Sequence, residues 1–328
     1  MRPDQLHPAI RHRIRFLPSI PAGPLGRVIG RAVRARLPEG RLPEGVLSGL
    51  VGDLPGGPSR LYVPAPGTPR TGAALLWIHG GGLVSGSAAQ DHQWAGRLCA
   101  ALGVVVVSAE YRLAPEHPYP VPLDDCRAVW EWLLEHAGDL GVDTGRLAVG
   151  GQSAGGGLAA ALAQRLRDEG GPQPAAQWLF CPMLDDRTAA DRALDGIRHP
   201  VWNNRSNRAG WASYLGVEPG ATEPAPPGHA VPARRRDLAG LPPAWIGVGD
   251  ADLFHQEDCA YAERLRAAGV DTVLDVMPGA PHGVETLAGE VPWVRAYVGR
   301  ARDWLADRLA DRPADRPAGR PADGPPGD

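Results

Sequence analysis

Leu147-Ala-Val-Gly-Gly-Gln-Ser-Ala-Gly-Gly-Gly-Leu158 is the stretch of sequence on which the fold depends. Its apolar start predicts a short strand, and the Ala- and Leu-rich residues after it predict a helix that continues to Leu166. Between the two, Gly151-x-Ser153-x-Gly155 matches the nucleophile elbow, in which glycines on both sides of a serine let the backbone turn sharply and expose the hydroxyl. The stretch therefore predicts a strand, a tight turn and a helix, with Ser153 as a candidate nucleophile.

The same turn aims the N–H of Ala154 at the serine hydroxyl, beside the positive end of a helix dipole. A second interpretation stays open, in which Ser153 is an ordinary helix-capping residue in a Gly-rich turn. The chain holds 43 glycines, so the motif arises by chance more readily here than in an average chain. The choice between a nucleophile and a helix-capping residue therefore depends on motifs elsewhere in the sequence.

Composition bounds the class of protein. The chain has 328 residues, 43% of them hydrophobic, so it can bury one large core or two modest ones. No stretch reaches the roughly 18 apolar residues of a membrane span, and the start, Met1-Arg-Pro-Asp-Gln5, lacks the apolar run of a signal peptide. The net charge of −3 gives no reason to expect nucleic acid as a partner. We therefore expect a soluble, cytoplasmic protein without membrane insertion, whose oligomeric state stays open, a homodimer included.

The cysteines and the absence of lysine limit the kinds of site that the chain can form. The four cysteines are widely spaced in apolar or helical contexts, which indicates reduced core residues with neither a disulfide framework nor a metal site: Cys99, Cys126, Cys181 and Cys259. All 34 basic residues are arginines, which excludes lysine chemistry. No His-Glu-x-x-His or EF-hand pattern occurs, so we expect no metal and no cofactor.

Strands alternate with helices from about residue 60 onward, which predicts an α/β fold with a mostly parallel central sheet flanked by helices. Ligands of such sheets bind beyond the carboxyl ends of the strands. Residues 46–186 and 237–310 form the predicted catalytic core. The predicted strands cover 59–63, 73–79, 104–108, 147–149, 177–181, 245–249 and 272–277, and the predicted helices cover 90–102, 123–136, 158–166, 256–268 and 293–309.

Three segments do not follow this alternation of strands and helices. Residues 1–45 carry apolar positions at helical spacing, which predicts two amphipathic cap helices; we favour a lid over a membrane-surface anchor or simple packing. Residues 187–236, with Trp202 among Asn, Arg and Pro, predict an inserted helical cap. Residues 311–328 are rich in proline without an apolar face, which predicts a disordered tail.

A second glycine-rich site, His79-Gly80-Gly81-Gly82, directly follows a predicted buried strand. Consecutive glycines leave backbone N–H groups unshielded, which suits them to bind a developing oxyanion. A plain loop and a phosphate cradle are the alternatives, but no Gly-Lys-Ser/Thr follows as a phosphate loop requires. With Ser153, the loop supplies the charge stabilisation that nucleophilic attack needs.

These motifs resemble the hormone-sensitive lipase family of α/β-hydrolases, which includes many bacterial esterases. The residues that carry the resemblance appear in the family's order: His79-Gly-Gly-Gly82, Tyr111-Arg-Leu-Ala-Pro-Glu116, Gly151-Gln-Ser-Ala-Gly-Gly156, Asp252-Leu-Phe-His-Gln-Glu257 and Pro281-His-Gly283. The resemblance implies an α/β-hydrolase fold with a helical cap. It also implies a catalytic triad of Ser153, Asp252 and His282.

The resemblance further implies an oxyanion hole from the N–H groups of Gly81, Gly82 and Ala154. Asp250 stands two residues before Asp252 and is the alternative acid, which the family motif disfavours.

Three positions add detail to the match. The family usually has an acidic residue before the nucleophile, but this chain has Gln152, which can form hydrogen bonds without a charge. Leu83 replaces an aromatic residue that often follows the glycines. Arg112 and Glu116 are expected to form a buried charged pair.

The implied activity is that of a serine carboxylesterase acting on short- to medium-chain acyl esters through an acyl-enzyme intermediate. The expected partner is a small-molecule acyl ester. An amide or carbamate hydrolase and a natural-product deacetylase are alternatives on the same triad, and a ligand-binding receptor is the non-enzymatic alternative. We expect activity to fall at acidic pH as His282 becomes protonated near its unperturbed pKa of about 6.5.

Overall fold

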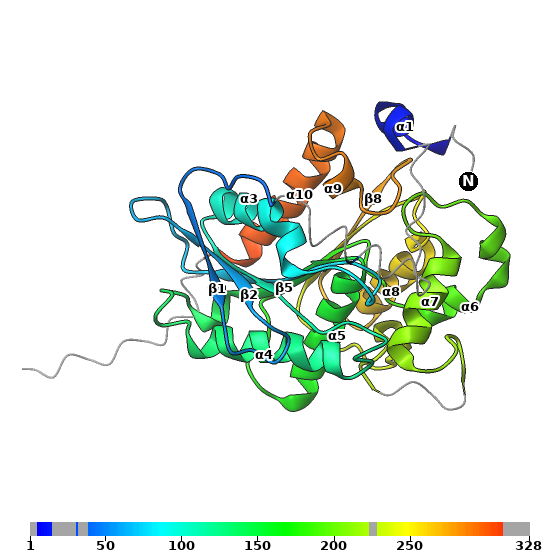
Figure 1. Ribbon diagram of the computed structural model, residues 1–328, viewed down its shortest axis with the longest axis horizontal. Helices are drawn as coiled ribbons and strands as arrows, with labels where there is room; N and C mark the ends of the chain where they lie inside the picture. The colour runs from blue at the N-terminus through cyan, green and yellow to red at the C-terminus, as the bar shows by residue number, and fades with distance from the viewer. Residues whose placement is uncertain (1–4, 15–30, 32–38, 223–227, 311–328) are drawn as a thin grey trace, which may run out of the picture.

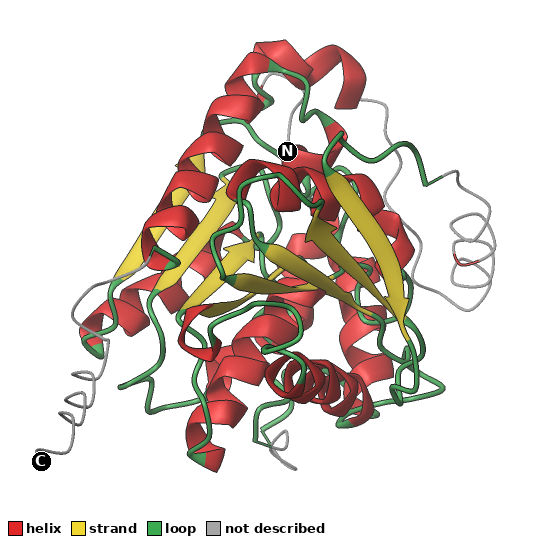
Figure 2. Cartoon of the chain, turned by 90° about the vertical axis from the view of Figure 1, so that its left-hand side faces the viewer, coloured by secondary structure: helices red, strands yellow, loops and turns green. Residues whose placement is uncertain are grey.

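Within the part of the chain that the structure describes, an eight-stranded sheet forms the centre, with helices on both of its faces (Figures 1 and 2). The computed structural model describes residues 5–14, 31, 39–222 and 228–310. The strand order is β1-β2-β4-β3-β5-β6-β7-β8. The β1–β2 and β2–β4 pairs are antiparallel, and every pair from β4–β3 to β7–β8 is parallel. The predicted α/β class with a mostly parallel sheet is therefore confirmed.

Seven of these strands lie where the hydrophobic runs predict them, within a few residues at each end. The strands are β1 (Val46–Val51), β2 (Ser59–Pro64), β3 (Ala74–Ile78), β4 (Val105–Ala109), β5 (Leu147–Gln152), β6 (Ala176–Phe180), β7 (Ala244–Gly249) and β8 (Thr272–Met277). The sequence patterns do not predict β1. Among the strands that the structure describes, β1 pairs only with β2 and lies at the sheet edge, where Leu47 and Leu50 are exposed, so the usual alternation is missing.

The helices divide between the two faces of the sheet. The helices of the core and its connections are α1 (Pro8–Ile14), α3 (His92–Leu102), α4 (Val121–Glu135), α5 (Ala154–Glu169), α8 (His255–Ala267), α9 (Val284–Leu287) and α10 (Pro292–Arg308), with short 3₁₀ turns η2 (Ala88–Asp91) and η3 (Thr144–Arg146). Apolar residues of α4, α5 and α8 share one core cluster, and those of α1, α3 and α10 share the other.

The strands supply both clusters because successive side chains of a strand point to opposite faces. In β3, Leu76 and Ile78 pack with α4 and α5, whereas Leu75 and Trp77 pack with α3. All five residues of β3 are buried. At roughly 1.5–3 kcal/mol for each large apolar side chain buried, this two-sided burial stabilises the sheet that carries the loops described below.

The connection from β6 to β7 contains the elements within the predicted cap insertion: α6 (Asp186–Ala190), η4 (Arg192–Gly196), α7 (Asn204–Leu215) and η5 (Pro232–Arg234). The division of the chain into core and cap remains a prediction. So does the lid role of the N-terminal helices. The only one of them described, α1, buries Ile10 and Ile14 in the core, and the N–H of His7 donates to Gly279 O. Most of the second predicted helix and the predicted tail at 311–328 lie outside the described residues.

Among the helices that the structure describes, none combines the length and the apolarity needed to cross a bilayer.

Candidate active site

Ser153 stands at a sharp turn between β5 and α5, with a φ of 57° and a ψ of −122°. A positive φ is costly for a residue with a Cβ, so the surrounding contacts must hold it. The N–H of Ser153 donates to Phe180 O, and its own carbonyl accepts from the N–H of Met183. A Cβ on Gly155 would lie 2.0 Å from Ile78 O, so this packing requires glycine there. The side chain of Ser153 makes no capping hydrogen bond, and the helix-capping interpretation is therefore wrong.

The structure brings Ser153, His282 and Asp252 into one continuous row. His282 Nε2 lies 2.8 Å from Ser153 Oγ, and His282 Nδ1 lies 2.8 Å from Asp252 Oδ2. All three residues are buried. Asp252 Oδ1 accepts from the N–H of Phe254, which fixes the carboxylate. The alternative acid, Asp250, instead accepts from the N–H of Gly279.

These residues meet because β3, β5, β7 and β8 are parallel, so the loops that leave their carboxyl ends emerge at the same edge of the sheet. Ser153 follows β5, Asp252 follows β7 and His282 follows β8. The row can transfer a proton from the hydroxyl of Ser153 to the imidazole while the carboxylate fixes the ring.

The glycine loop after β3 lies directly against the elbow. A Cβ on Gly80 would lie 3.3 Å from Ser153 Cβ, and a Cβ on Gly81 would collide with Ser85 O at 1.8 Å. Gly81 and Gly82 have φ values of 135° and 63°, which favour glycine. The phenol of Tyr111 donates to His79 O, and the two rings stack. The loop thus presents backbone rather than side chains near the serine.

The cap segment contacts this loop through two residues that the sequence analysis did not identify as part of the site. A Cβ on Gly82 would lie 2.2 Å from Trp202 Cη2, so the indole packs against that glycine. A Cβ on Gly210, in α7, would lie 2.7 Å from Gly82 O. Trp202 is only 3% exposed. The loop is therefore held between the sheet and the cap segment, a long-range contact for which no motif exists.

Arg31 ties the N-terminal segment to the same region. Its guanidinium donates to Val84 O and Ala114 O and pairs with Glu116. Arg112 pairs instead with the buried Asp125. The predicted buried Arg112–Glu116 pair is therefore wrong, because each residue pairs with a different residue of opposite charge, and Glu116 is exposed.

Known proteins are similar to this chain in sequence and in fold. The model of a protein family described as the α/β hydrolase fold matches residues 75–286. Esterase LipI of Mycobacterium tuberculosis is 36% identical over 292 residues, which cover 87% of this chain and 83% of LipI. The chain belongs to this α/β-hydrolase family.

Solved structures agree with that assignment. A bacterial heroin esterase superposes with a TM-score of 0.80 at 32% identity, covering 94% of this chain and 99% of the other. An esterase from the bacterial hormone-sensitive lipase family superposes with a TM-score of 0.71 at 30% identity, covering 92% and 96%. The family resemblance read from the motifs is confirmed.

Electrostatics around the imidazole of this α/β-hydrolase favour its protonated form. Burial lowers the pKa of His282, but the charge and hydrogen bond of Asp252, together with the charge of Glu285, outweigh burial and raise the pKa above its usual value. Such a histidine is a stronger base than an isolated one. The carboxylate of Asp252 also stabilises the imidazolium that forms when the ring accepts a proton.

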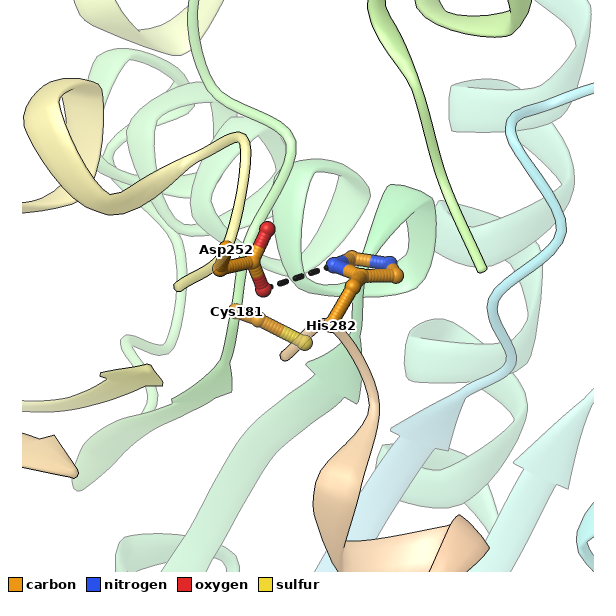
Figure 3. Close-up of side chains that lie close together, drawn as sticks. All are labelled: Cys181, Asp252 and His282. Carbon is orange, nitrogen blue, oxygen red and sulfur yellow. Dashed lines mark hydrogen bonds and ion pairs between the residues drawn. The ribbon is translucent and has the colours of Figure 1, made fainter. Parts of the chain in front are cut away.

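Cys181 lies beside the same pair of residues (Figure 3). Its Sγ, an Asp252 oxygen and a His282 nitrogen lie within 4.8 Å of one another, which is close enough for a metal ion to bridge them after rearrangement. An ion at this point would displace the 2.8 Å hydrogen bond between Asp252 and His282. Burial raises the pKa of the Cys181 thiol well above its usual value, which disfavours the thiolate that a metal requires. The arrangement thus favours the hydrogen-bonded pair over a metal centre.

Cys99, Cys126 and Cys181 are buried, as predicted for core residues, whereas Cys259 is partly exposed, so the core prediction is wrong for Cys259.

Proposed function

We propose that this α/β-hydrolase is a serine carboxylesterase that hydrolyses short- to medium-chain acyl esters through an acyl-enzyme intermediate. The observation that carries the proposal is the hydrogen-bonded row of Ser153, His282 and Asp252. Relatives across most of the chain are named esterases, which supports carboxylic esters as the substrate class. Under this proposal the substrate is a small molecule, and no metal or cofactor takes part.

The mechanism follows from the order of the groups. Ser153 Oγ attacks the ester carbonyl carbon while His282 Nε2 accepts the hydroxyl proton. Asp252 holds the proton on Nδ1 and so keeps Nε2 free as the base. The resulting imidazolium then protonates the leaving alcohol, and the acyl group stays on Ser153. A water molecule, deprotonated by the same imidazole, attacks the acyl-enzyme; the bond between Ser153 Oγ and the acyl carbon breaks, Oγ takes the proton back from the imidazolium, and the acid is released.

The N–H groups of Gly81, Gly82 and Ala154 are the proposed donors to the oxyanion of each tetrahedral intermediate. The N–H of Ala154 belongs to the first residue of α5, where the helix dipole adds positive potential. Since each such donor typically contributes about 3 kcal/mol to transition-state stabilisation, the position of the glycine loop matters as much as the triad.

The proposed acyl length rests on the space above the glycine loop. Trp202 packs on Gly82, and Leu83 is buried beside the loop. We therefore expect these side chains to shape the space that receives the acyl chain beside the serine. Acyl length is thus the part of the proposal that depends most on the cap segment.

A panel of p-nitrophenyl esters from acetate to palmitate, assayed with the wild type and Ser153→Ala, tests the proposal. We expect the highest kcat/KM for short and medium esters and loss of turnover in the variant. Faster turnover of p-nitroanilides than of the matched esters would favour the amide hydrolase instead. Binding of esters without turnover by the wild type would favour the receptor.

A further inference from the structure

The side chain of Gln152, directly before the nucleophile, lies between three parts of the site. It is 9% exposed, at the end of β5. Its Oε1 lies 3.6 Å from where a Cβ on Gly80 would stand, and its Nε2 lies 3.6 Å from where one on Gly283 would stand. The amide therefore sits between the elbow, the glycine loop and the loop that carries His282.

The partner of this amide is a buried carboxylate. Gln152 Nε2 donates to Glu285 Oε1 at 2.5 Å and contacts Thr286 Oγ1 at 3.3 Å. Glu285 lies in the first turn of α9, three residues after His282, and is 5% exposed. The thiol of Cys181 donates to the same oxygen, Oε1, at 3.9 Å. A carboxylate at this depth is costly unless it is hydrogen-bonded, so its contacts specify the position of the loop.

We propose that Glu285 is a positioning residue of the hydrolytic reaction: bound to Gln152, it fixes the histidine loop to the nucleophile elbow and places a second carboxylate near the imidazole of His282. This inference rests on the proposed esterase function. Glu285 does not touch the reacting atoms; it acts through His282 and Gln152.

The charges around the pair are consistent with this role. Within the described residues, the titratable groups that interact with Glu285 are His282, Asp252, Cys181 and Tyr297. Burial raises the pKa of Glu285 above its usual value, and the hydrogen bond from Gln152 and the charge of His282 offset only part of this effect. The charge of Glu285, in turn, adds to that of Asp252 in raising the pKa of His282. Burial keeps Cys181 and Tyr297 neutral by raising the pKa of each.

The contact with Glu285 explains why an amide, and not an acid, stands at position 152. An acid there would face Glu285 with like charge at hydrogen-bonding distance, and one of the two would have to be protonated. An amide instead donates to the carboxylate and keeps it charged. Gln152 and Glu285 therefore form one unit, with the negative charge of the pair on the side of the histidine loop.

The test compares Glu285→Gln, Gln152→Glu and the double exchange Gln152→Glu/Glu285→Gln, with Glu131→Gln, on the exposed surface of α4, as the matched control. Rates are measured with p-nitrophenyl acetate and divided by the concentration of active sites titrated with a phosphonate ester, so that misfolded protein does not count. We expect Glu285→Gln to lower kcat about tenfold, with KM changed by no more than about twofold. We expect the acid limb of its pH profile to move to lower pH, by about half a unit to one unit, because a charge that raises the pKa of His282 is gone.

Gln152→Glu is expected to lower kcat at least as much, because it places two carboxyl groups at hydrogen-bonding distance from each other. The double exchange restores a donor opposite a carboxylate and is expected to recover kcat to within about threefold of the wild type. An unchanged kcat and acid limb in Glu285→Gln would overturn the proposal. A fall in kcat with an unmoved acid limb would overturn it as well, because packing alone would then explain the effect.

Failure of the esterase proposal gives a different result. In that case Ser153→Ala turns over the ester as fast as the wild type, or neither protein is active. Failure of the present inference alone leaves an active wild type, an inactive Ser153→Ala and a Glu285→Gln variant that behaves as Glu131→Gln does.

Discussion

His282 Nε2 lies 2.8 Å from the hydroxyl oxygen of Ser153, across 129 positions of sequence. The two residues follow β5 and β8, which are separated in the sheet by β6 and β7. Because these four strands are parallel, the loops at their carboxyl ends converge, and the loop after β7 brings Asp252 to the far side of the imidazole. The alignment of the site is thus a property of the sheet rather than of any one loop.

Asp252→Asn should lower kcat by about 10⁴-fold, because the amide no longer holds the proton on His282 Nδ1. Asp250→Asn is the matched control: Asp250 accepts only a backbone hydrogen bond from Gly279 among its described contacts, and an asparagine oxygen can accept it too. We expect the control to keep kcat within a few-fold of the wild type. Steady-state kinetics on a p-nitrophenyl ester measure both. Equal losses in the two variants would remove Asp252 from its proposed role.

The pH profile of kcat/KM should have its acid limb above pH 6.5. Only the neutral imidazole accepts the serine proton, and Asp252 and Glu285 raise the pKa of His282 against the effect of burial, so protonation begins at higher pH than for a free histidine. The sequence alone predicts a limb near the unperturbed value of about 6.5. Rates read at the isosbestic wavelength of p-nitrophenol avoid the titration of the product. A midpoint below 6.5 would contradict the electrostatic account.

Gly82→Ala should lower kcat by about 100-fold or more, with the fold intact. The added methyl would lie 2.2 Å from Trp202 Cη2, at a φ of 63° that disfavours any Cβ, so the loop must move and its N–H with it. Gly49→Ala in β1, where nothing lies within 4 Å of the new Cβ, is the control and should leave kcat unchanged. Circular dichroism checks folding. Wild-type kcat in Gly82→Ala would show that this N–H takes no part.

Glu110→Gln should stabilise the protein more at pH 8 than at pH 5. Burial raises the pKa of Glu110 from 4.5 to about 7, although the N–H of Ala88 donates to its carboxylate. Between these two values the folded chain holds a proton that the unfolded chain has released, so the free energy of unfolding falls as pH rises through this window and stays lower above it. The glutamine removes this dependence.

At 1.36 kcal/mol for each pKa unit, the difference in the free energy of unfolding reaches at most about 3 kcal/mol. Urea unfolding at the two pH values measures it. Glu131→Gln, a change on the exposed surface of α4, is measured alongside as the control. An identical effect of Glu110→Gln at both pH values would show that Glu110 titrates normally.

Much of the fold follows from local pattern. The buried run at β3 is apolar at every position, and the run at β4 is apolar at every position except Ser108, because helices cover both faces of the sheet; such runs are visible in any sequence. Local pattern does not predict the edge strand β1, since its exposed Leu47 and Leu50 break the alternation that identifies a half-buried strand. Its place in the sheet is set by pairing with β2, which is a tertiary contact.

The candidate site likewise contains residues that motifs predict and residues that only tertiary contacts place there. Ser153, Asp252 and His282 stand in motifs whose glycines and order are tied to the chemistry, so the sequence points to them directly. Trp202 and Glu285 stand in no such motif. Trp202 reaches Gly82 across 120 positions, and Glu285 reaches Gln152 across 133. These contacts arise from how the cap segment and the histidine loop pack, which local pattern does not encode.

Covalent labelling with a fluorophosphonate, followed by peptide mass spectrometry, tests the central claim most directly. The account predicts one phosphonylated residue for each chain, Ser153, with loss of esterase activity in proportion to labelling. It predicts no label and a kcat lower by about 10⁴- to 10⁶-fold in Ser153→Ala. Stoichiometric labelling at another residue, or ester hydrolysis by Ser153→Ala at the wild-type rate, would contradict it.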